Sequence, residues 1–526
     1  MLTIGNAHSG DTSPRVLHGG HIMSADRPNV ILFITDQWRA KDAGYWGNPV
    51  IQTPHIDALA AEGAGFRRCF VQNPVSTPSR ACMASAWYCH VNGHRTMHHM
   101  LRRHEPNMLR YFKEAGYYVW WGGKNDMIAE SVIPDSCHQR VTGTGGQPVA
   151  KVEPWKLGDR LYHTFLWGEV PENYGPSLSD DYVARQAAEF IARPPSEPYF
   201  LLVNQTFPHP PYAVHEPYYS MYDRAQVPFP IRPPADFKGK PAIIKRVHER
   251  MRMNEVTDDE LREIVAVFYG MITKTDRNLG WIMDALKETG QWDNTILVAS
   301  SDHGDFAGDY ASTEKMQNTF EDCLTNVPFA IRVPGCEPLP GPTDALIEMI
   351  DLLPTLAEAC GVELGHTHFG RSLLPVLRGE ATEHREYVFS EGGALATEIH
   401  THETARPKEN IYWGRPDLQF TEPRVHGKAV MIRSHDWKYV RRMYDTDELY
   451  DLRNDPDEVT NLIDEPGLEG VKAEMIAAMA DWFIATGDQV PWRWDRRGPN
   501  EEHPEWSADA MKHGFVSDVD EDQGKA

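Results

Sequence analysis

Two strand-length runs of apolar residues stand out along the chain. The run at 29–35, NVILFIT, and the run at 294–302, NTILVASSD, are almost continuously apolar instead of alternating with polar residues. This pattern is typical of a strand that is buried on both faces of a parallel sheet. The segments at 117–122 and 199–206 have the same character, so we expect them to join the same sheet.

Helical patterns separate these apolar runs. Thr53 and Pro54 supply an N-cap and a proline at the first helical position of HIDALAAEG. Further helices are predicted at 107–115, 179–194, 257–289 and 343–361. Pro354 predicts a kink or break within the last of them. Strands that alternate with helices predict an α/β fold, with a mostly parallel central sheet sandwiched by helices.

The pattern changes after about residue 385, where short alternating runs predict antiparallel strands followed by a final amphipathic helix. We therefore divide the chain into four parts. These are a flexible N-terminal extension (1–27), an α/β domain (28–385), a smaller C-terminal α+β subdomain (386–495) and an acidic tail (496–526).

Charge and cysteine content limit the partners and the compartment. The formal net charge of −24 argues against nucleic acid or an anionic membrane surface as the main partner. The seven cysteines are an odd number without CxxC spacing, which favours a reduced protein without a disulfide framework. The polar first 28 residues lack the apolar core of a signal peptide, so we expect a cytoplasmic protein without a membrane span.

Candidate metal ligands follow two of the apolar runs. Asp36 and Gln37 come directly after 29–35, and Asp302 and His303 come at the end of 294–302. Carboxylate and amide oxygens with an imidazole form a plausible site for a divalent cation. A single Asp at a strand end is more often a turn residue or a helix cap, so this hypothesis depends on the two pairs meeting.

A possible anion site begins at Ser76 in the motif NPVSTPSR, with Arg80 one helical turn later. A helix N-terminus offers free amide donors, and an arginine there can hold an anion with forked hydrogen bonds. The alternative is an ordinary helix cap beside a surface arginine. Lys124, His209 and Lys315 also lie in loops after strands. Each alone is typically just solvated, but together they would bind an oxyanion and protonate a leaving oxygen.

The order of these motifs resembles the sulfatase family of the alkaline phosphatase superfamily. The resemblance covers about residues 28–350 and resumes in ELYDLRNDPDEVTNL. It implies that Asp36, Gln37, Asp302 and His303 hold one divalent metal ion. The D-Q and D-H pairs are similar to the choline-sulfatase and phosphonate monoester hydrolase branch, which implies calcium, with manganese as the alternative.

The resemblance also implies the roles around the substrate. Ser76 stands where sulfatases carry the residue that a formylglycine-generating maturation enzyme oxidises. Arg80, Lys124, His209 and Lys315 would surround that residue and the sulfate group of a small-molecule or carbohydrate ester. Members of this branch commonly self-associate, but the sequence leaves the choice between a monomer and a homo-oligomer open.

Two positions depart from the family pattern. Asp126 stands where a histidine is usual, and we expect it to recognise a sugar hydroxyl or a cationic group of the substrate. Ser76 replaces the commoner cysteine, and it could be matured to formylglycine, remain a serine, or be a substitution for cysteine. A plain serine would favour a phosphodiester or phosphonate monoester hydrolase, or a ligand-binding relative without turnover, over a sulfatase.

The segment after the nucleophile motif, at 87–105, is rich in histidine, arginine and aromatic residues. The simplest interpretation is a solvated loop and the start of a helix. The alternative is that His94 and Arg95 line the substrate entrance and supply positive potential to an acidic protein.

Overall fold

A computed structural model describes residues 27–489 of the chain. Its centre is an eight-stranded sheet with the strand order β10-β2-β9-β8-β1-β6-β3-β4. These strands are β1 (Asn29–Thr35), β2 (Ala64–Phe70), β3 (Tyr118–Gly122), β4 (Gln139–Val141), β6 (Tyr199–Asn204), β8 (Thr295–Ser301), β9 (Asn326–Arg332) and β10 (Ile347–Glu348). Only β9 runs antiparallel to its neighbours in this sheet, so the predicted mostly parallel sheet is confirmed.

The register of the two central strands places the candidate metal ligands side by side. β1 and β8 pair in parallel, with Thr35 opposite Ser301. Asp36 and Asp302 therefore leave the sheet at adjacent positions of the same edge. The continuous apolar pattern of both strands is explained by their position, because every residue of β1 and β8 is buried.

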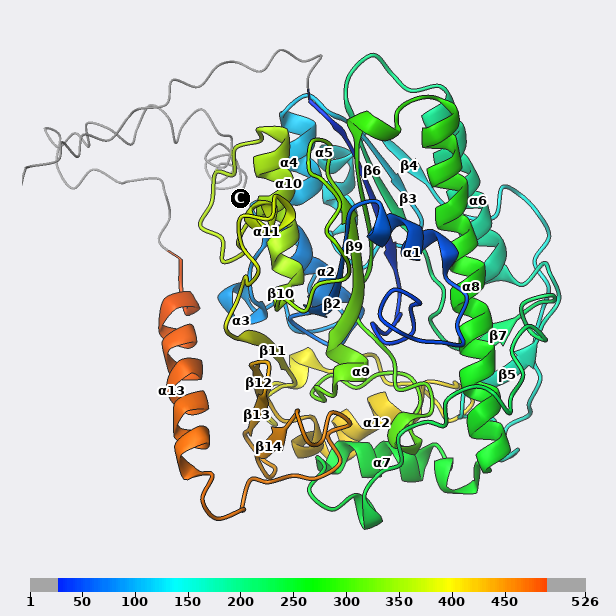
Figure 1. Cartoon of the computed structure of the whole chain (residues 1–526). Coiled ribbons are helices and arrows are strands. Elements are labelled where there is room, and N and C mark those ends of the chain that lie inside the picture. Colours follow the sequence, from blue (N-terminus) through cyan, green and yellow to red (C-terminus); the bar gives the residue numbers. More distant parts are fainter. Residues whose placement is uncertain (1–26, 490–526) are drawn as a thin grey trace, which may run out of the picture.

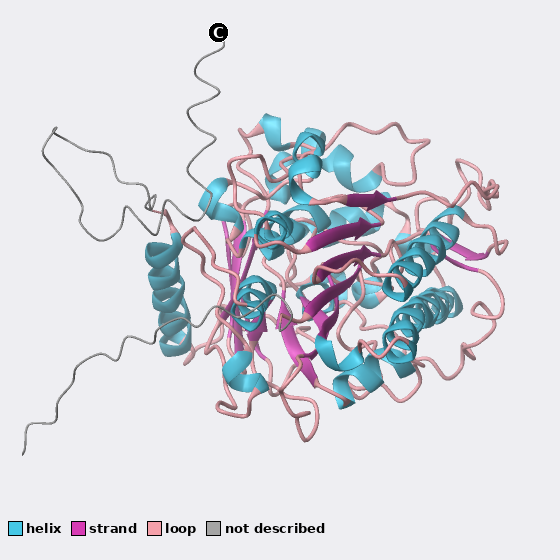
Figure 2. Cartoon of the chain, turned by 90° about the horizontal axis from the view of Figure 1, so that it is seen from above, coloured by secondary structure: helices cyan, strands magenta, loops and turns pink. Residues whose placement is uncertain are grey.

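Helices cover both faces of the sheet (Figures 1 and 2). Helices α1 (Pro54–Ala61), α6 (Gly175–Ala192) and α8 (Asp258–Glu288) share one apolar core, to which Ile31 and Phe33 of β1 contribute. Helices α2 (Ser76–Ser85), α4 (Met108–Glu114) and α10 (Leu352–Cys360) share the other, to which Val30 and Leu32 contribute. The other helices before the second sheet are α3 (Cys89–Asn92), α5 (Ile133–Ser136), α7 (Ala242–Arg250), α9 (Asp322–Thr325) and α11 (Leu374–Leu377).

The predicted helix at 343–361 is wrong in its first part. Residues Ile347–Glu348 form β10, which pairs in parallel with β2 at the edge of the sheet. The helix α10 begins only at Leu352, so Pro354 lies in its first turn instead of kinking it. Proline is tolerated there because the first amide groups of a helix have no partner within the helix.

The C-terminal part forms a second, antiparallel sheet in the order β11-β12-β13-β14. Its strands are β11 (Val388–Gly392), β12 (Ala429–Arg433), β13 (Trp437–Arg442) and β14 (Glu448–Asp451). Helix α12 (Gly414–Thr421) lies in the long connection from β11 to β12, and a small separate sheet pairs β5 (Leu166–Glu169) with β7 (Tyr212–Val214). The smaller α+β unit predicted from the sequence therefore forms.

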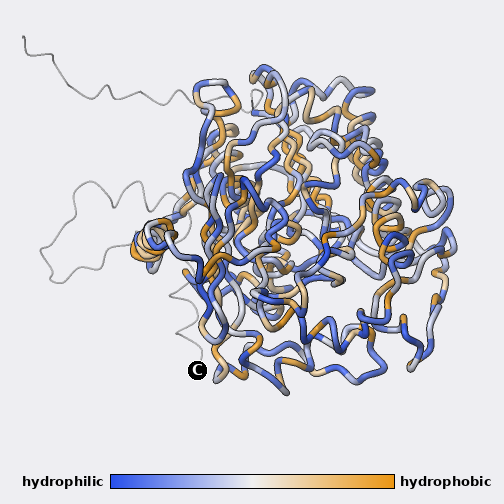
Figure 3. The backbone as a smooth tube through the Cα atoms, turned by 60° about the horizontal axis from the view of Figure 1, so that its bottom comes forward, coloured by the Kyte–Doolittle hydropathy of each residue, from blue (hydrophilic) through white to orange (hydrophobic). Residues whose placement is uncertain are grey.

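The last helix, α13 (Glu469–Thr486), packs on the second sheet through Met475, Met479 and Trp482. The ring of Trp482 stacks on that of Phe389 with 4.4 Å between centroids. Figure 3 shows apolar stretches along this helix, and Ile484 on it is 82% exposed.

No helix among residues 27–489 has both the length and the apolar character needed to cross a membrane. The predicted extension (1–27, except Arg27) and acidic tail (496–526) lie outside the described residues.

Buried ions join the second sheet to the larger one. The Lys438 Nζ atom on β13 is 2.6 Å from Asp322 Oδ1 and 2.9 Å from the carbonyl oxygen of Phe320, and it also contacts Glu458. The Lys438 side chain is 1% exposed. Burial raises the pKa of Glu458 to about 7, although Lys438 opposes that effect. Lys438 therefore pairs with the buried carboxylate of Glu458 and with Asp322, which is 26% exposed and also pairs with Arg433.

Replacing Lys438 by methionine should destabilise the protein by about 3–5 kcal/mol, because the buried Glu458 would lose its lysine partner while Asp322 would keep only Arg433. The free energy of unfolding in urea measures this effect. Lys287→Met is the matched control, since Lys287 makes an exposed ion pair with Glu62 and its loss should cost about 1 kcal/mol or less. Equal stability of the two variants would contradict the proposed role of Lys438.

Candidate active site

Ser76 begins α2 and lies at the carboxyl edge of the central strands. Its Oγ atom is 3.0 Å from Nε2 of His303 and 3.4 Å from Oδ1 of Asp36, and the residue is fully buried. The side chain of Asn73 shapes the preceding loop, because it accepts from the Val75 amide and donates to the Glu391 carbonyl on β11. The second sheet thus helps to hold the loop that presents Ser76.

Asp36, Asp302 and His303 converge next to Ser76. One ligand atom from each lies within 4.8 Å of the other two. His303 Nδ1 donates to the Gly304 carbonyl at 2.8 Å, so Nε2 carries the lone pair. Burial lowers the pKa of His303, which keeps the ring neutral. Two carboxylates and a neutral imidazole with a free lone pair are the donor set of a divalent cation, so these residues fit a metal site.

Cations compensate the two carboxylates. Arg80 Nε donates to Asp302 Oδ2 at 2.8 Å, and Lys124 Nζ contacts Asp36. Burial alone would raise the pKa of Asp36, but the charges of Lys124 and Lys315 outweigh it and lower that pKa well below the usual value. Asp36 is therefore ionised although it has no exposure to solvent.

Gln37 lies beside the predicted metal ligands, but its side chain forms hydrogen bonds with Lys315 and Asp305. Its amide oxygen accepts from Lys315 Nζ at 2.6 Å, and its amide nitrogen donates to Asp305 Oδ2 at 2.6 Å. The backbone amide of Gln37 donates to Asp302 Oδ1 at 3.3 Å. The amide oxygen keeps a second lone pair, so the sequence prediction of Gln37 as a metal ligand stays a prediction.

Arg80 has one donor without a protein partner. Its Nη2 atom donates to the Thr35 carbonyl at 3.2 Å, whereas Nη1 is buried and has no hydrogen-bond partner among the described residues. A buried guanidinium nitrogen without a partner is costly unless a ligand satisfies it. Its place one turn after Ser76 suits an anion bound at the start of α2.

Lys124 bridges Asp36 and Asp126. The Lys124 Nζ atom lies 2.8 Å from Asp126 Oδ2, and the Asp126 side chain is 17% exposed. The unusual carboxylate at position 126 is therefore paired with a lysine of the site, and its charge does not face an anion unopposed. This contact explains how an acidic residue is accommodated where histidine was expected.

His209 and Lys315 form a direct pair. Lys315 Nζ is 3.0 Å from His209 Nε2 and 2.8 Å from Glu314 Oε1, and His209 Nδ1 donates to the Pro210 carbonyl at 2.6 Å. Burial first, and then the nearby Lys315, lower the pKa of His209 to about 3. His209 is therefore neutral at pH 7, with its Nε2 lone pair directed at the lysine. Within this pair, Lys315 Nζ is therefore the donor and His209 Nε2 the acceptor.

Residues that the sequence analysis missed hold this pair in place. The two carboxylate oxygens of Asp180 accept from the amides of Thr206 and Phe207 at 2.7 and 2.8 Å, which shapes the turn before His209. Acidic residues at the start of a helix are common, so Asp180 carried no distinguishing signal.

Glu314, Tyr412 and Arg415 form the side of the site that was not foreseen. Burial alone would raise the pKa of Glu314, but Lys315 and Arg415 lower it to about 2. The Tyr412 hydroxyl donates to the Pro210 carbonyl at 3.0 Å. Tyr412 and Arg415 belong to the connection between β11 and β12, which was expected to be outside the α/β domain. The only sequence signal for Glu314 was its position directly before Lys315, a predicted site residue.

His94 and Arg95 are engaged away from Ser76. His94 Nε2 lies 2.9 Å from Glu105 Oε1 and its Nδ1 bonds to the His99 carbonyl, while Arg95 bonds to the Gly393 carbonyl and to Glu398. The described residues provide no contact between either side chain and the Ser76 group. The segment itself is close, since the Thr77 hydroxyl donates to the Met97 carbonyl at 3.3 Å. Their role at the substrate entrance stays a prediction.

Known proteins resemble this chain in both sequence and fold. An ulvan-active sulfatase of Formosa agariphila is 26% identical over 91% of this chain and 84% of its own length. A choline-sulfatase of Rhizobium meliloti is 25% identical over 84% of each chain. The solved phosphonate monoester hydrolase of Agrobacterium radiobacter superposes with a TM-score of 0.71, at 22% identity, over 91% of this chain and all of the other. The sulfatase family model matches residues 28–362, and the chain therefore belongs to the sulfatase family.

Proposed function

We propose that this chain hydrolyses sulfate esters, with residue 76 as the nucleophile. The position of Ser76 Oγ, 3.0 Å from the free nitrogen of His303 and beside ionised Asp36, is the observation that carries the proposal. Family membership and the sulfatase relatives support it. The substrate is a small-molecule or carbohydrate sulfate ester.

The cationic side chains have separate tasks in this proposal. Arg80 Nη1, which has no partner among residues 27–489, would donate to a sulfate oxygen, and Lys124 would neutralise a second one. Lys315 is the proton donor to the leaving oxygen, because the neighbouring His209 is neutral. Glu314 and Gln37 hold the ammonium group of Lys315 toward the site.

A divalent cation fits beside the nucleophile. Asp36, Asp302 and His303 would hold it, with Gln37 as a further ligand, and calcium or manganese suits these donors. The ion would supply a positive charge that lowers the pKa of the attacking hydroxyl. Lys124 lowers the pKa of Asp36, burial lowers the pKa of His303, and Arg80 donates a hydrogen bond to Asp302.

The chemical state of Ser76 decides between two reactions. A plain serine would form a sulfate ester whose release requires slow cleavage at sulfur. Formylglycine, the aldehyde that a maturation enzyme makes by removing two hydrogens from the side chain, adds water to become a geminal diol. One hydroxyl group of the diol would take the sulfuryl group from the substrate. The other would then lose its proton and expel sulfate by C–O cleavage, which restores the aldehyde. A phosphoserine is cleared by water more readily, so an unmodified Ser76 would favour the alternative, a phosphodiester or phosphonate monoester hydrolase.

Mass spectrometry of the peptide spanning residues 68–80, combined with kinetics, tests this proposal. Protein that is active on 4-nitrophenyl sulfate should contain residue 76 lighter by two hydrogens, and Ser76→Ala should lower kcat by about 10⁴-fold or more. Ser85→Ala, on the same helix, is the control and should stay within about threefold. Plain Ser76 together with faster hydrolysis of a phosphonate monoester would replace the proposal by its alternative.

Asp126→Asn tests substrate recognition. Because Asp126 faces Lys124 at the edge of the site, we expect its neutralisation to change the ratio of kcat/KM for a sugar sulfate and an aryl sulfate by about tenfold. The kcat on the aryl ester should change much less. Glu288→Gln, an exposed charge change on α8, controls for net charge. An equal loss on both substrates would argue against recognition by Asp126.

Chelation tests the metal site. Removal of divalent ions with EDTA should lower Tm by about 3 °C or more, and added Ca²⁺ or Mn²⁺ should restore it, since a bound ion stabilises only the folded chain. Asp36→Asn should abolish this response. Asp344→Asn, at an exposed ion pair with Arg67, should retain it. A Tm that is insensitive to EDTA in the parent protein would contradict the assignment.

A further inference from the structure

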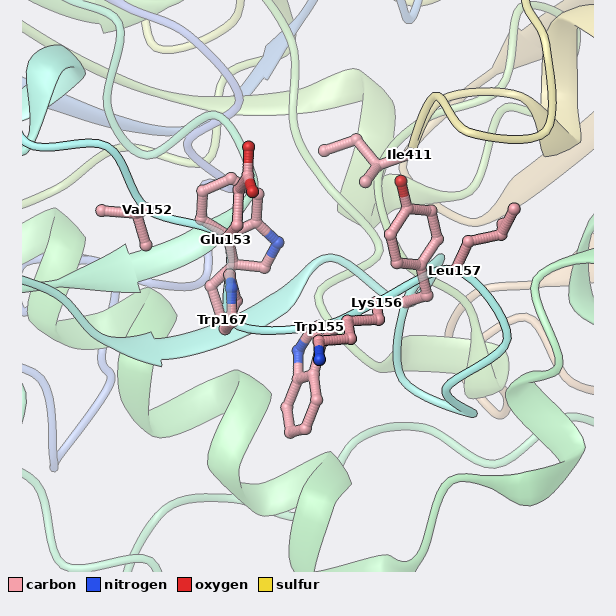
Figure 4. A pocket seen from close by; sticks show the side chains of 9 residues that line it. Val152, Glu153, Trp155, Lys156, Leu157, Trp167 and Ile411 are labelled. Atoms are coloured by element: carbon pink, nitrogen blue, oxygen red, sulfur yellow. The ribbon is translucent and has the colours of Figure 1, made fainter.

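A pocket of about 370 Å³ lies beside the candidate active site and has no role in the reaction described above. Its walls include Trp155, Tyr162 and Trp167 from the segment between β4 and α6, and Ile411 from the connection between β11 and β12. Figure 4 shows Trp155, Trp167 and Ile411 around one space, with Glu153 and Lys156 near them. Two segments that are far apart in sequence therefore build it together.

Contacts link this pocket to the reaction centre. Ile411 precedes Tyr412, whose hydroxyl donates to the Pro210 carbonyl and whose ring centroid lies 6.2 Å from that of His209. Tyr162 donates to the Glu409 carbonyl at 2.6 Å, which joins the two walls. One wall of the pocket therefore belongs to the same segment as Tyr412, which contacts the loop of His209.

Hydrogen bonds hold the pocket side chains Trp155 and Tyr162 in place, and both rings remain partly exposed to solvent. Trp155 donates its indole N–H to the Leu166 carbonyl at 2.6 Å, so the polar edge of the ring is already satisfied. Trp155, Tyr162 and Trp167 are each half-buried. Rigid, partly exposed aromatic rings present flat apolar surface to a ligand at little cost in side-chain entropy.

Charges at the rim narrow the choice of ligand. Glu153 and Lys156 are both exposed, and they have opposite sign. Glu153 also lies 3.0 Å from Lys151, so the rim carries charges of both signs and does not favour a ligand of a single charge, such as a quaternary ammonium ion. A pyranose ring satisfies all of these features, since its C–H face packs on aromatic rings while its hydroxyl or acidic groups meet the two charged side chains.

We propose that this pocket is a subsite for a saccharide ring of a sulfated oligosaccharide, on the leaving-group side of the ring that bears the cleaved ester. The inference rests on the proposed function for the position of that ester. It assigns the chain to oligosaccharide sulfates and not to small alkyl or aryl sulfates. Trp155 and Trp167 carry the stacking contacts, and Glu153 and Lys156 the polar ones.

The first experiment measures binding without turnover. Calorimetry of the full chain carrying Ser76→Ala, with a heparin tetrasaccharide and a κ-carrageenan tetrasaccharide, should show binding of at least one. Adding Trp155→Leu should weaken the Kd by about tenfold or more, and Trp155→Phe should recover part of the loss. Trp46→Ala, at another exposed tryptophan that does not line the pocket, should have no effect.

The second experiment compares substrates in the active protein. Trp155→Leu should lower the ratio of kcat/KM on the bound sulfated tetrasaccharide to kcat/KM on 4-nitrophenyl sulfate by about tenfold. An unchanged Tm for Trp155→Phe shows that folding is intact. Absence of binding by both tetrasaccharides, or binding unaffected by Trp155→Leu, overturns the subsite. Binding that depends on Trp155 in a parent protein that cleaves no sulfate ester supports the subsite and overturns the proposed function instead.

Discussion

The compensation of buried charge at the edge of the central sheet is the constraint on which the rest of this structure depends. Asp36 and Asp302 leave adjacent strands with no exposure to solvent, where an unpaired carboxylate would be very unfavourable. Arg80 and Lys124 supply the opposing charges, from α2 and from the loop after β3. The pairs that stabilise the fold are therefore the same pairs that bring the nucleophile and the anion-binding groups together.

This arrangement also explains why the second sheet is more than an appendage. β11 contacts the loop before Ser76 through the Asn73 side chain, and the connection after β11 delivers Tyr412 and Arg415 to His209 and Glu314. Lys438 on β13 also joins the two parts, through ion pairs with Asp322 and Glu458. The active centre is consequently built from both parts of the chain, and movement between them would disturb it.

Electrostatics assign different tasks to residues of similar type. His303 and His209 are both neutral because they are buried, but His303 directs its lone pair at Ser76 while His209 directs it at Lys315. Lys124 shares its charge between two carboxylates, whereas Lys315 keeps its charge beside a single one. One histidine thus suits a metal ion and the other suits the leaving group.

The sequence by itself determined the parallel sheet and the helices on both faces, and it named most of the residues that meet at the candidate site. The apolar runs ending at Thr35 and Ser301 identify buried parallel strands, and such strands place the following polar residues at one edge. The antiparallel direction of β9, the short strand β10 and the roles of Asp180, Tyr412 and Arg415 were decided only by the tertiary structure. Their contacts join residues that are distant in sequence, so these contacts could not be predicted from a local periodicity or a motif. The aromatic pocket has the same origin, because Ile411 meets Trp155 and Trp167 only when both connections fold against the same edge.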